Sequence, residues 1–207
     1  MIALVTMLVL ASPCTAAPAP RLVANWLARP ITLDGELEEA EWTSTPSSGA
    51  FAGLDGRPVS PHTELRALWT KEALVLGVYS ADQDLRSSDV VHLKVGELLL
   101  EVSAAGKLVQ PVAGVRVAVE RDGSLDEDGT GEDDEEWLVE VSIPWSALGL
   151  KVAPRELSVA AWREDLPKGA SRRTVSWHHD CSGQPAAGVI ELLPAPRPSP
   201  HRGRGSP

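Results

Sequence analysis

The sequence predicts an all-β domain, a β-sandwich or jelly roll with short helical turns. Apolar residues alternate with polar ones over many short segments, and glycine- or aspartate-containing turns separate these segments. No long stretch has helical periodicity, so the apolar side chains are arranged to bury one face of a sheet. We expect one domain over residues 17–193, which is long enough to form a proper core.

The first element along the chain is an apolar leader at residues 1–16. It carries no charge, runs from Ile2 to Leu10 and ends in small residues and proline, a pattern typical of a signal peptide cleaved after Ala16. It is too short to cross a bilayer, which needs about 20 apolar residues. Because no basic residue precedes it, a buried N-terminal strand is the alternative. We expect an exported protein, secreted or periplasmic.

The strands of the body are predicted by alternation. Leu65, Ala67 and Trp69 alternate with polar neighbours, whereas Ala73–Tyr79 is apolar on both sides and suits a central strand. The other expected strands are Arg21–Leu27, Val90–Val95, Leu98–Ser103, Val115–Val119, Trp137–Ile143, Glu156–Arg163, Arg172–Trp177 and Val189–Leu193. Two short helical turns are expected, at Glu36–Trp42 and Trp145–Leu148.

Two segments interrupt the pattern. Residues Asp126–Glu136 contain eight acidic residues in eleven and predict a solvated hairpin loop. Residues 194–207, rich in proline, glycine and arginine, predict a disordered tail because they can bury little apolar surface. The net charge of −10 argues against nucleic acid and anionic membrane as partners.

Four segments occur in an order and spacing that match a known pattern. They are Ile31–Trp42 with its Asp34-Gly35 turn, Leu65–Trp69 followed by Leu74–Tyr79 and Asp82, Trp137–Trp145 with its Ile-Pro-Trp ending, and Trp162–Asp165 followed by Gly188–Leu192. Together they resemble the carbohydrate-binding modules of family nine. The resemblance implies a non-catalytic β-sandwich that binds an oligosaccharide or polysaccharide, often beside polysaccharide-degrading enzymes. The wider superfamily includes haem-binding domains, so the fold alone leaves the ligand open.

The resemblance also implies where a sugar would bind. In that family two tryptophans clamp one end of the sugar. One of these tryptophans comes from a loop after the acidic turn, and the other from a late loop before the last strand. The first loop is shortened here to Asp84–Asp89 and has no aromatic residue, whereas the late loop offers Trp177. Sugars need flat aromatic faces and planar polar groups. We therefore predict a ligand site formed by Trp177, Trp162, His178 and Asp180. The remaining motif tryptophans are expected in the core: Trp42, Trp69, Trp137 and Trp145.

A metal site is predicted at the acidic turn. Carboxylates in a turn supply the oxygen ligands that calcium prefers, and the family often carries structural calcium. The expected ligands are Asp82, Asp84 and Asp89.

Other functions have weaker support. The sequence has no nucleophile elbow, glycine-rich phosphate loop or zinc-binding helix motif, so we do not expect an enzyme. The resemblance implies an accessory of glycoside hydrolases instead. One alternative is a scaffold that kept the sandwich, lost the sugar clamp and binds a protein partner. The other is a haem domain. After cleavage the chain has no methionine, which would leave axial ligation to His62, His92, His178 or His179.

Overall fold

The strands of the protein form one strongly curved sheet in a computed structural model, which describes residues 18–60, 62–126, 136–166 and 169–195. The strand order is β6-β5-β4-β9-β11-β1-β2-β3-β8-β7, and β10 pairs with β9. The elements are β1 (Arg21–Trp26), α1 (Ala40–Thr43), β2 (Thr63–Trp69), β3 (Ala73–Ala81), β4 (Val90–Val95), β5 (Leu98–Ser103), β6 (Lys107–Leu108), β7 (Arg116–Asp122), β8 (Glu136–Pro144), the 3₁₀ turn η1 (Trp145–Leu148), β9 (Glu156–Asp165), β10 (Arg173–Ser176) and β11 (Gly188–Leu192).

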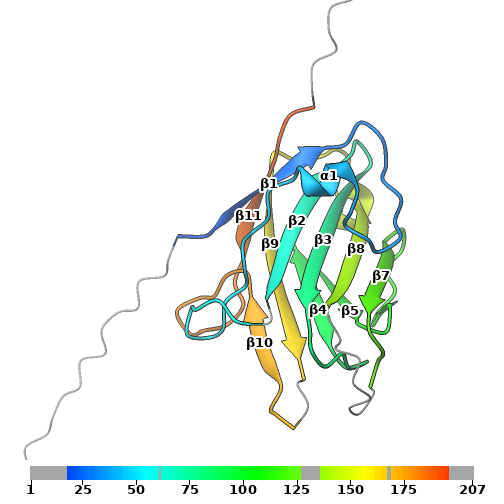
Figure 1. The fold of residues 1–207 in the computed structure, drawn as a ribbon. Helices are drawn as coiled ribbons and strands as arrows, with labels where there is room; N and C mark the ends of the chain where they lie inside the picture. The colour runs from blue at the N-terminus through cyan, green and yellow to red at the C-terminus, as the bar shows by residue number, and fades with distance from the viewer. Residues whose placement is uncertain (1–17, 61, 127–135, 167–168, 196–207) are drawn as a thin grey trace, which may run out of the picture.

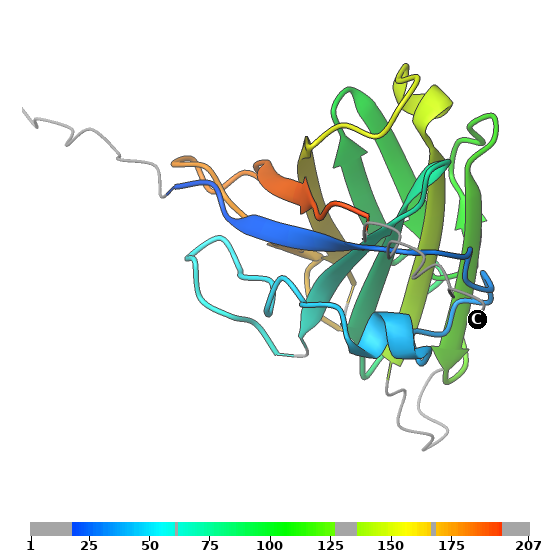
Figure 2. The same cartoon turned by 90° about the horizontal axis from the view of Figure 1, so that it is seen from above.

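The sheet folds over on itself, so that its two halves face each other (Figures 1 and 2). Strand β1 joins the halves and pairs in parallel with both β11 and β2. Apolar residues from both halves meet in the interior, among them Leu65, Leu76, Val139, Leu93 and Val159. The predicted sandwich is confirmed. It forms because alternation gives each strand one apolar face and the curvature of the sheet brings these faces together.

The predicted strands agree closely with the observed ones. The bounds of β4 and β5 match the expected ranges, and β3 is buried along most of its length, as its uniformly apolar sequence predicted. The short β6 was not expected, because two residues are too few to show alternation. No helix in the described part of the chain is long and apolar enough to span a membrane. The predicted leader and acidic run, except Asp126 and Glu136, lie outside the described residues, as does the tail beyond Ala195.

The first helical turn is shorter than predicted, because Glu140 on β8 holds the residues before it in a turn. Its Oε2 accepts hydrogen bonds from the backbone N–H groups of Asp34 and Gly35 at 3.0 and 2.9 Å. Its Oε1 accepts one from Trp42 Nε1 at 2.9 Å. Gly35 has a φ of +99°, and a Cβ there would lie 2.5 Å from the backbone nitrogen of Glu120. The helix therefore begins at Ala40 instead of Glu36.

This turn and helix cover the outer face of β3. Trp42 is fully buried in a small second core with Leu27, Leu68 and Val75. Gly77 allows the close approach, since a Cβ at that position would lie 2.8 Å from Leu37 Cδ2. The expected core role of the motif tryptophans is borne out for three of them: Trp42, Trp137 and Trp145 are at most 3% exposed. Trp69 is only half-buried and packs edge-on against Trp26 at 4.6 Å.

Candidate functional site

The predicted stacking residue Trp177 follows β10 and is half-buried. Its six-membered ring lies over Gly188, where a Cβ would come within 2.6 Å of it. The Trp177 backbone N–H donates to the Ala161 carbonyl at 3.0 Å, which fixes the residue against β9. Part of the indole therefore packs against the sandwich, and the rest is accessible beside His178.

Asp180 shapes the loop that follows Trp177. Its Oδ1 accepts hydrogen bonds from the backbone N–H groups of Ser182 and Gln184 and from the Ser182 hydroxyl. These bonds, chiefly those from Ser182, lower the pKa of Asp180. The backbone carbonyl of His178 accepts hydrogen bonds from the Ser176 hydroxyl at 2.6 Å and from the Ala186 N–H. The loop is thus held by its own hydrogen bonds.

Trp162 lies on the outer face of β9 and is half-buried. Its ring stacks on His92 of β4, with centroids 4.7 Å apart and planes only 4° from parallel. The register pairs these two residues directly. The His92 ring nitrogens lie 3.3 and 3.7 Å from Glu101 and Glu164, and burial lowers the pKa of His92 against the opposing pull of these carboxylates. One face of Trp162 is therefore taken by a histidine.

The predicted calcium ligands separate into two groups. Asp82 and Asp89 come together with Asp165, so that one oxygen of each lies within 4.8 Å of the others. Asp84 points elsewhere, and its Oδ1 is 2.7 Å from Arg86 Nη2. Burial raises the pKa of Asp89 to about 6, although backbone N–H groups donate to both of its carboxylate oxygens.

An arginine lies inside this aspartate cluster. Arg163 is 1% exposed, and its Nη2 contacts both Asp82 and Asp165. Its Nη1 donates to the Ala81 carbonyl at 2.8 Å, and its guanidinium carbon is 5.8 Å from the centre of the Trp137 ring. Arg163 and Asp165 continue the inward-facing positions of β9 after Val159 and Ala161. The sequence signal for this cluster was that Arg163 and Asp165 continue the inward-facing alternation of Val159 and Ala161. The sequence-based prediction missed this signal.

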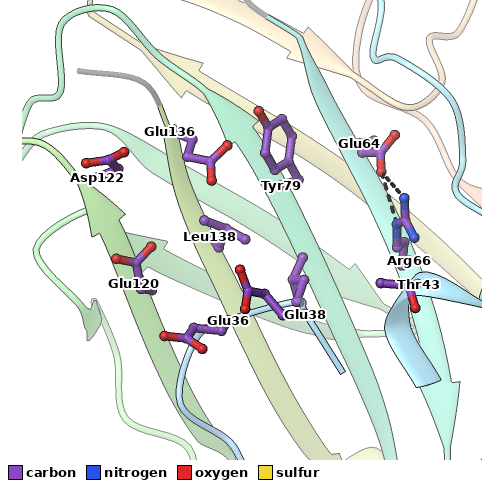
Figure 3. A pocket seen from close by; sticks show the side chains of 11 residues that line it. Glu36, Glu38, Thr43, Glu64, Arg66, Tyr79, Glu120, Asp122, Glu136 and Leu138 are labelled. Carbon is purple, nitrogen blue, oxygen red and sulfur yellow. Dashed lines mark hydrogen bonds and ion pairs between the residues drawn. The ribbon is translucent and has the colours of Figure 1, made fainter. Parts of the chain in front are cut away.

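A groove of about 370 Å³ lies on the outer face of β2, β3, β8 and β7, beside the turn that precedes α1 (Figure 3). The register aligns Glu64, Tyr79, Leu138 and Glu120 in one row across these four strands. Tyr79 stands between Glu136 and the Glu64–Arg66 pair (Figure 3). The lining residues are Glu36, Leu37, Glu38, Thr43, Glu64, Arg66, Tyr79, Glu120, Asp122, Glu136 and Leu138.

The groove combines an aromatic face, an apolar floor and a strongly acidic rim. Six of its lining residues carry a carboxylate and one is an arginine, which is bound to Glu64 at 2.8 Å. Burial raises the pKa of Glu120, and the charges of Asp122, Glu136 and Glu36 act in the same direction. The sequence analysis did not select this site. Its signal was the pair of outward-facing acids near the end of the β7 strand, Glu120 and Asp122.

Comparison with solved structures places this fold. A family 9 carbohydrate-binding module from Caldicellulosiruptor kristjanssonii, in complex with cellotriose, is similar with a TM-score of 0.58 and 14% identity. The match covers 86% of this chain and 100% of that one. The module in complex with glucose gives a TM-score of 0.57 at 13% identity, over 87% of this chain and 100% of that one.

A putative carbohydrate-binding protein from Bacteroides uniformis is similar with a TM-score of 0.58 and 15% identity, over 84% of this chain and 100% of that one. No protein-family model matches the chain, and no curated protein matches it. The resemblance predicted from four short segments is thus confirmed for the fold: the chain adopts the fold of the family 9 carbohydrate-binding modules.

Proposed function

We propose that the protein is a non-catalytic, exported module that binds a carbohydrate. One observation carries this proposal: the fold match covers the full length of modules that were solved with cellotriose and glucose. Neighbours of this kind support an accessory role beside glycoside hydrolases, in the recognition or breakdown of polysaccharides, outside the cytoplasm.

The Tyr79 groove is the first of two proposed binding sites. A sugar ring needs a flat aromatic face for its C–H groups and planar polar groups for its hydroxyls. Tyr79 supplies the first with the part of its ring that His62, 5.1 Å away between ring centroids, leaves uncovered. The paired Glu64 and Arg66 supply the second on the neighbouring strand. Leu138 gives the groove an apolar floor. The rim of carboxylates would repel an acidic glycan, so we expect a neutral or basic sugar.

The Trp177 loop is the second proposed site, with Trp162, His178 and Asp180 as its neighbours in the sequence-based prediction. Trp177 keeps part of its indole accessible while the remainder packs on Gly188. Such anchoring would hold a stacking face rigid, which lowers the entropy cost of binding. Trp162 would contribute the part of its ring that His92 leaves uncovered.

Calorimetric titration with neutral oligosaccharides, including cellotriose and glucose, tests the function and separates the two sites. Replacing the stacking residue of the site that binds, by Tyr79→Ala or by Trp177→Ala, should weaken binding by roughly two- to tenfold, since an aromatic contact is worth about 0.5–1.5 kcal/mol beyond area burial. Leu99→Ala is the matched control, because Leu99 is 45% exposed and lies outside the groove. Circular dichroism should show that each variant remains folded.

The proposal would be wrong if a broad panel of neutral and basic glycans, tested with calcium present, gave no heat of binding and no retardation in affinity gels. Loss of affinity in both Tyr79→Ala and Leu99→Ala would instead rule out the groove as the specific site.

A scaffold that binds a protein partner is the second candidate. The specific observation is the 84–89 loop, where Leu85 is buried and Asp84 pairs with Arg86, so that this half of the family clamp offers no aromatic face. A stable partner that co-purifies with the wild-type protein, and is lost on Glu120→Lys, would favour this function over sugar binding.

A further inference from the structure

The aspartate cluster at the end of the interior contains a cation supplied by the chain itself. Asp82, Asp89 and Asp165 are each at most 2% exposed, and buried carboxylates need compensation by charge or by hydrogen bonds. Arg163 lies among them and is equally buried. A calcium ion bound here would have to share these oxygens with Arg163.

Every carboxylate oxygen of the cluster already accepts from a protein donor. Asp82 accepts from the Asp84 N–H and from Arg163, and Asp89 accepts from the N–H groups of Arg86 and Leu166. Asp165 accepts from Arg163 through one oxygen and from Arg173 through the other. Calcium takes about six to eight oxygen ligands, and three of these six oxygens already contact a guanidinium nitrogen that a bound calcium ion would have to displace.

The position of the guanidinium adds an electrostatic obstacle. Arg163 Nη2 contacts Asp82 and lies 3.2 Å from Asp165 Oδ1. A calcium ion bound to the same oxygens would lie within roughly 5 Å of that guanidinium, where like charges repel in a poorly solvated interior. Arg163 is also fixed from two further directions, by the Ala81 carbonyl and by the ring of Trp137.

We propose that Arg163 is the resident cation of this cluster and occupies the place that a calcium ion would take. The fold then needs no calcium at Asp82, Asp89 and Asp165. The remaining predicted ligand, Asp84, is held by Arg86 and takes no part. This inference is independent of sugar binding, and its test does not use a sugar.

The test is thermal unfolding of the full chain in EGTA and in millimolar calcium chloride. We expect the wild type and Asp82→Asn to show the same calcium-dependent change in Tm, because neither binds calcium in the cluster. Arg163→Met keeps the length of the side chain but leaves three buried carboxylates with less compensation. Its Tm should fall in EGTA and rise by about 5 °C or more when calcium is added, by linkage of binding to folding.

Arg172→Met is the matched control, since Arg172 is half-exposed and its Nη1 lies 2.9 Å from Glu164. It should show the same response to calcium as the wild type. A rise in the wild-type Tm with calcium that disappears in Asp82→Asn would overturn the proposal, and this comparison does not depend on whether Arg163→Met folds. A folded Arg163→Met variant that ignores calcium would overturn it as well.

Discussion

Two sites in this protein bury carboxylates, and the two sites compensate the buried carboxylates with different donors. Glu140 is fully buried on the outer side of β8 and is satisfied by three neutral donors: two backbone N–H groups and the indole N–H of Trp42. The aspartate cluster is satisfied half by three backbone N–H groups and half by two guanidinium groups, from Arg163 and Arg173. Desolvation raises the pKa of Glu140 and brings that of Asp89 to about 6.

The difference teaches what each site contributes to the fold. Glu140 joins the Asp34-Gly35 turn to Trp42, so it determines where the covering segment lies on β3. The cluster joins the acidic turn after β3 to β9 and β10, so it closes the end of the sandwich. Removing one partner should therefore cost more in the cluster, because it leaves charge uncompensated as well as hydrogen bonds unmade.

The largest effect is expected for Arg163→Met. Removing the guanidinium takes away the counter-charge that contacts Asp82 and leaves Asp165 with Arg173 alone, so the free energy of unfolding at pH 7 should fall by about 3–5 kcal/mol. Urea unfolding monitored by tryptophan fluorescence measures it. Arg172→Met, whose ion pair is partly exposed, should cost no more than about 1 kcal/mol. Equal losses in the two variants would contradict the assigned role of the cluster.

A smaller loss is expected for Glu140→Gln. The amide can still accept from the two backbone N–H groups, but its NH₂ would face the indole N–H of Trp42, which is also a donor. The cost should be about 1–3 kcal/mol, the range for a buried polar group left without a partner. Glu97→Gln, at an exposed turn, is the control and should change stability by less than about 0.5 kcal/mol.

The smallest expected effect is the pH dependence of the stability difference between the wild type and Glu140→Gln. Because burial raises the folded-state pKa of Glu140, the folded state binds its proton more tightly than the unfolded chain does. This contribution to stability is present below the unfolded pKa and is lost as pH rises through the folded value. Unfolding measured from pH 4 to pH 7 should show the wild type losing stability relative to Glu140→Gln as pH rises. The opposite slope would mean that hydrogen bonding outweighs desolvation at this site.

Local sequence was sufficient for the strands. Alternation in 63–69 and 136–144, and the uniformly apolar run after Lys71, depend only on neighbouring residues, so these strands could be predicted well. The same information could not give the start of α1, because Glu140 decides it from almost a hundred residues further along the chain. Trp69 shows the same limit, since its burial depends on Trp26 across the parallel pair of β1 and β2.

The candidate sites depended even more on tertiary structure. Trp177 was selected from the sequence because it lies in the late loop of the family clamp, and Trp162 because it was not assigned to the core. The local sequence could not show their contacts with Gly188 and His92. The Tyr79 groove arises only when β2, β3, β8 and β7 lie in register. Residues from four strands must then share one outer face.

The sequence by itself thus determined an all-β chain and three of the four motif tryptophans that pack in its interior, because period-two burial is a local property. Tertiary structure decided which charges meet. Asp82 and Asp89 were expected to share a metal with Asp84, yet the pairing of β4 with β9 brings Arg163 and Asp165 to them instead. The physical reason is that strand order, rather than distance along the chain, determines which buried charges must compensate one another.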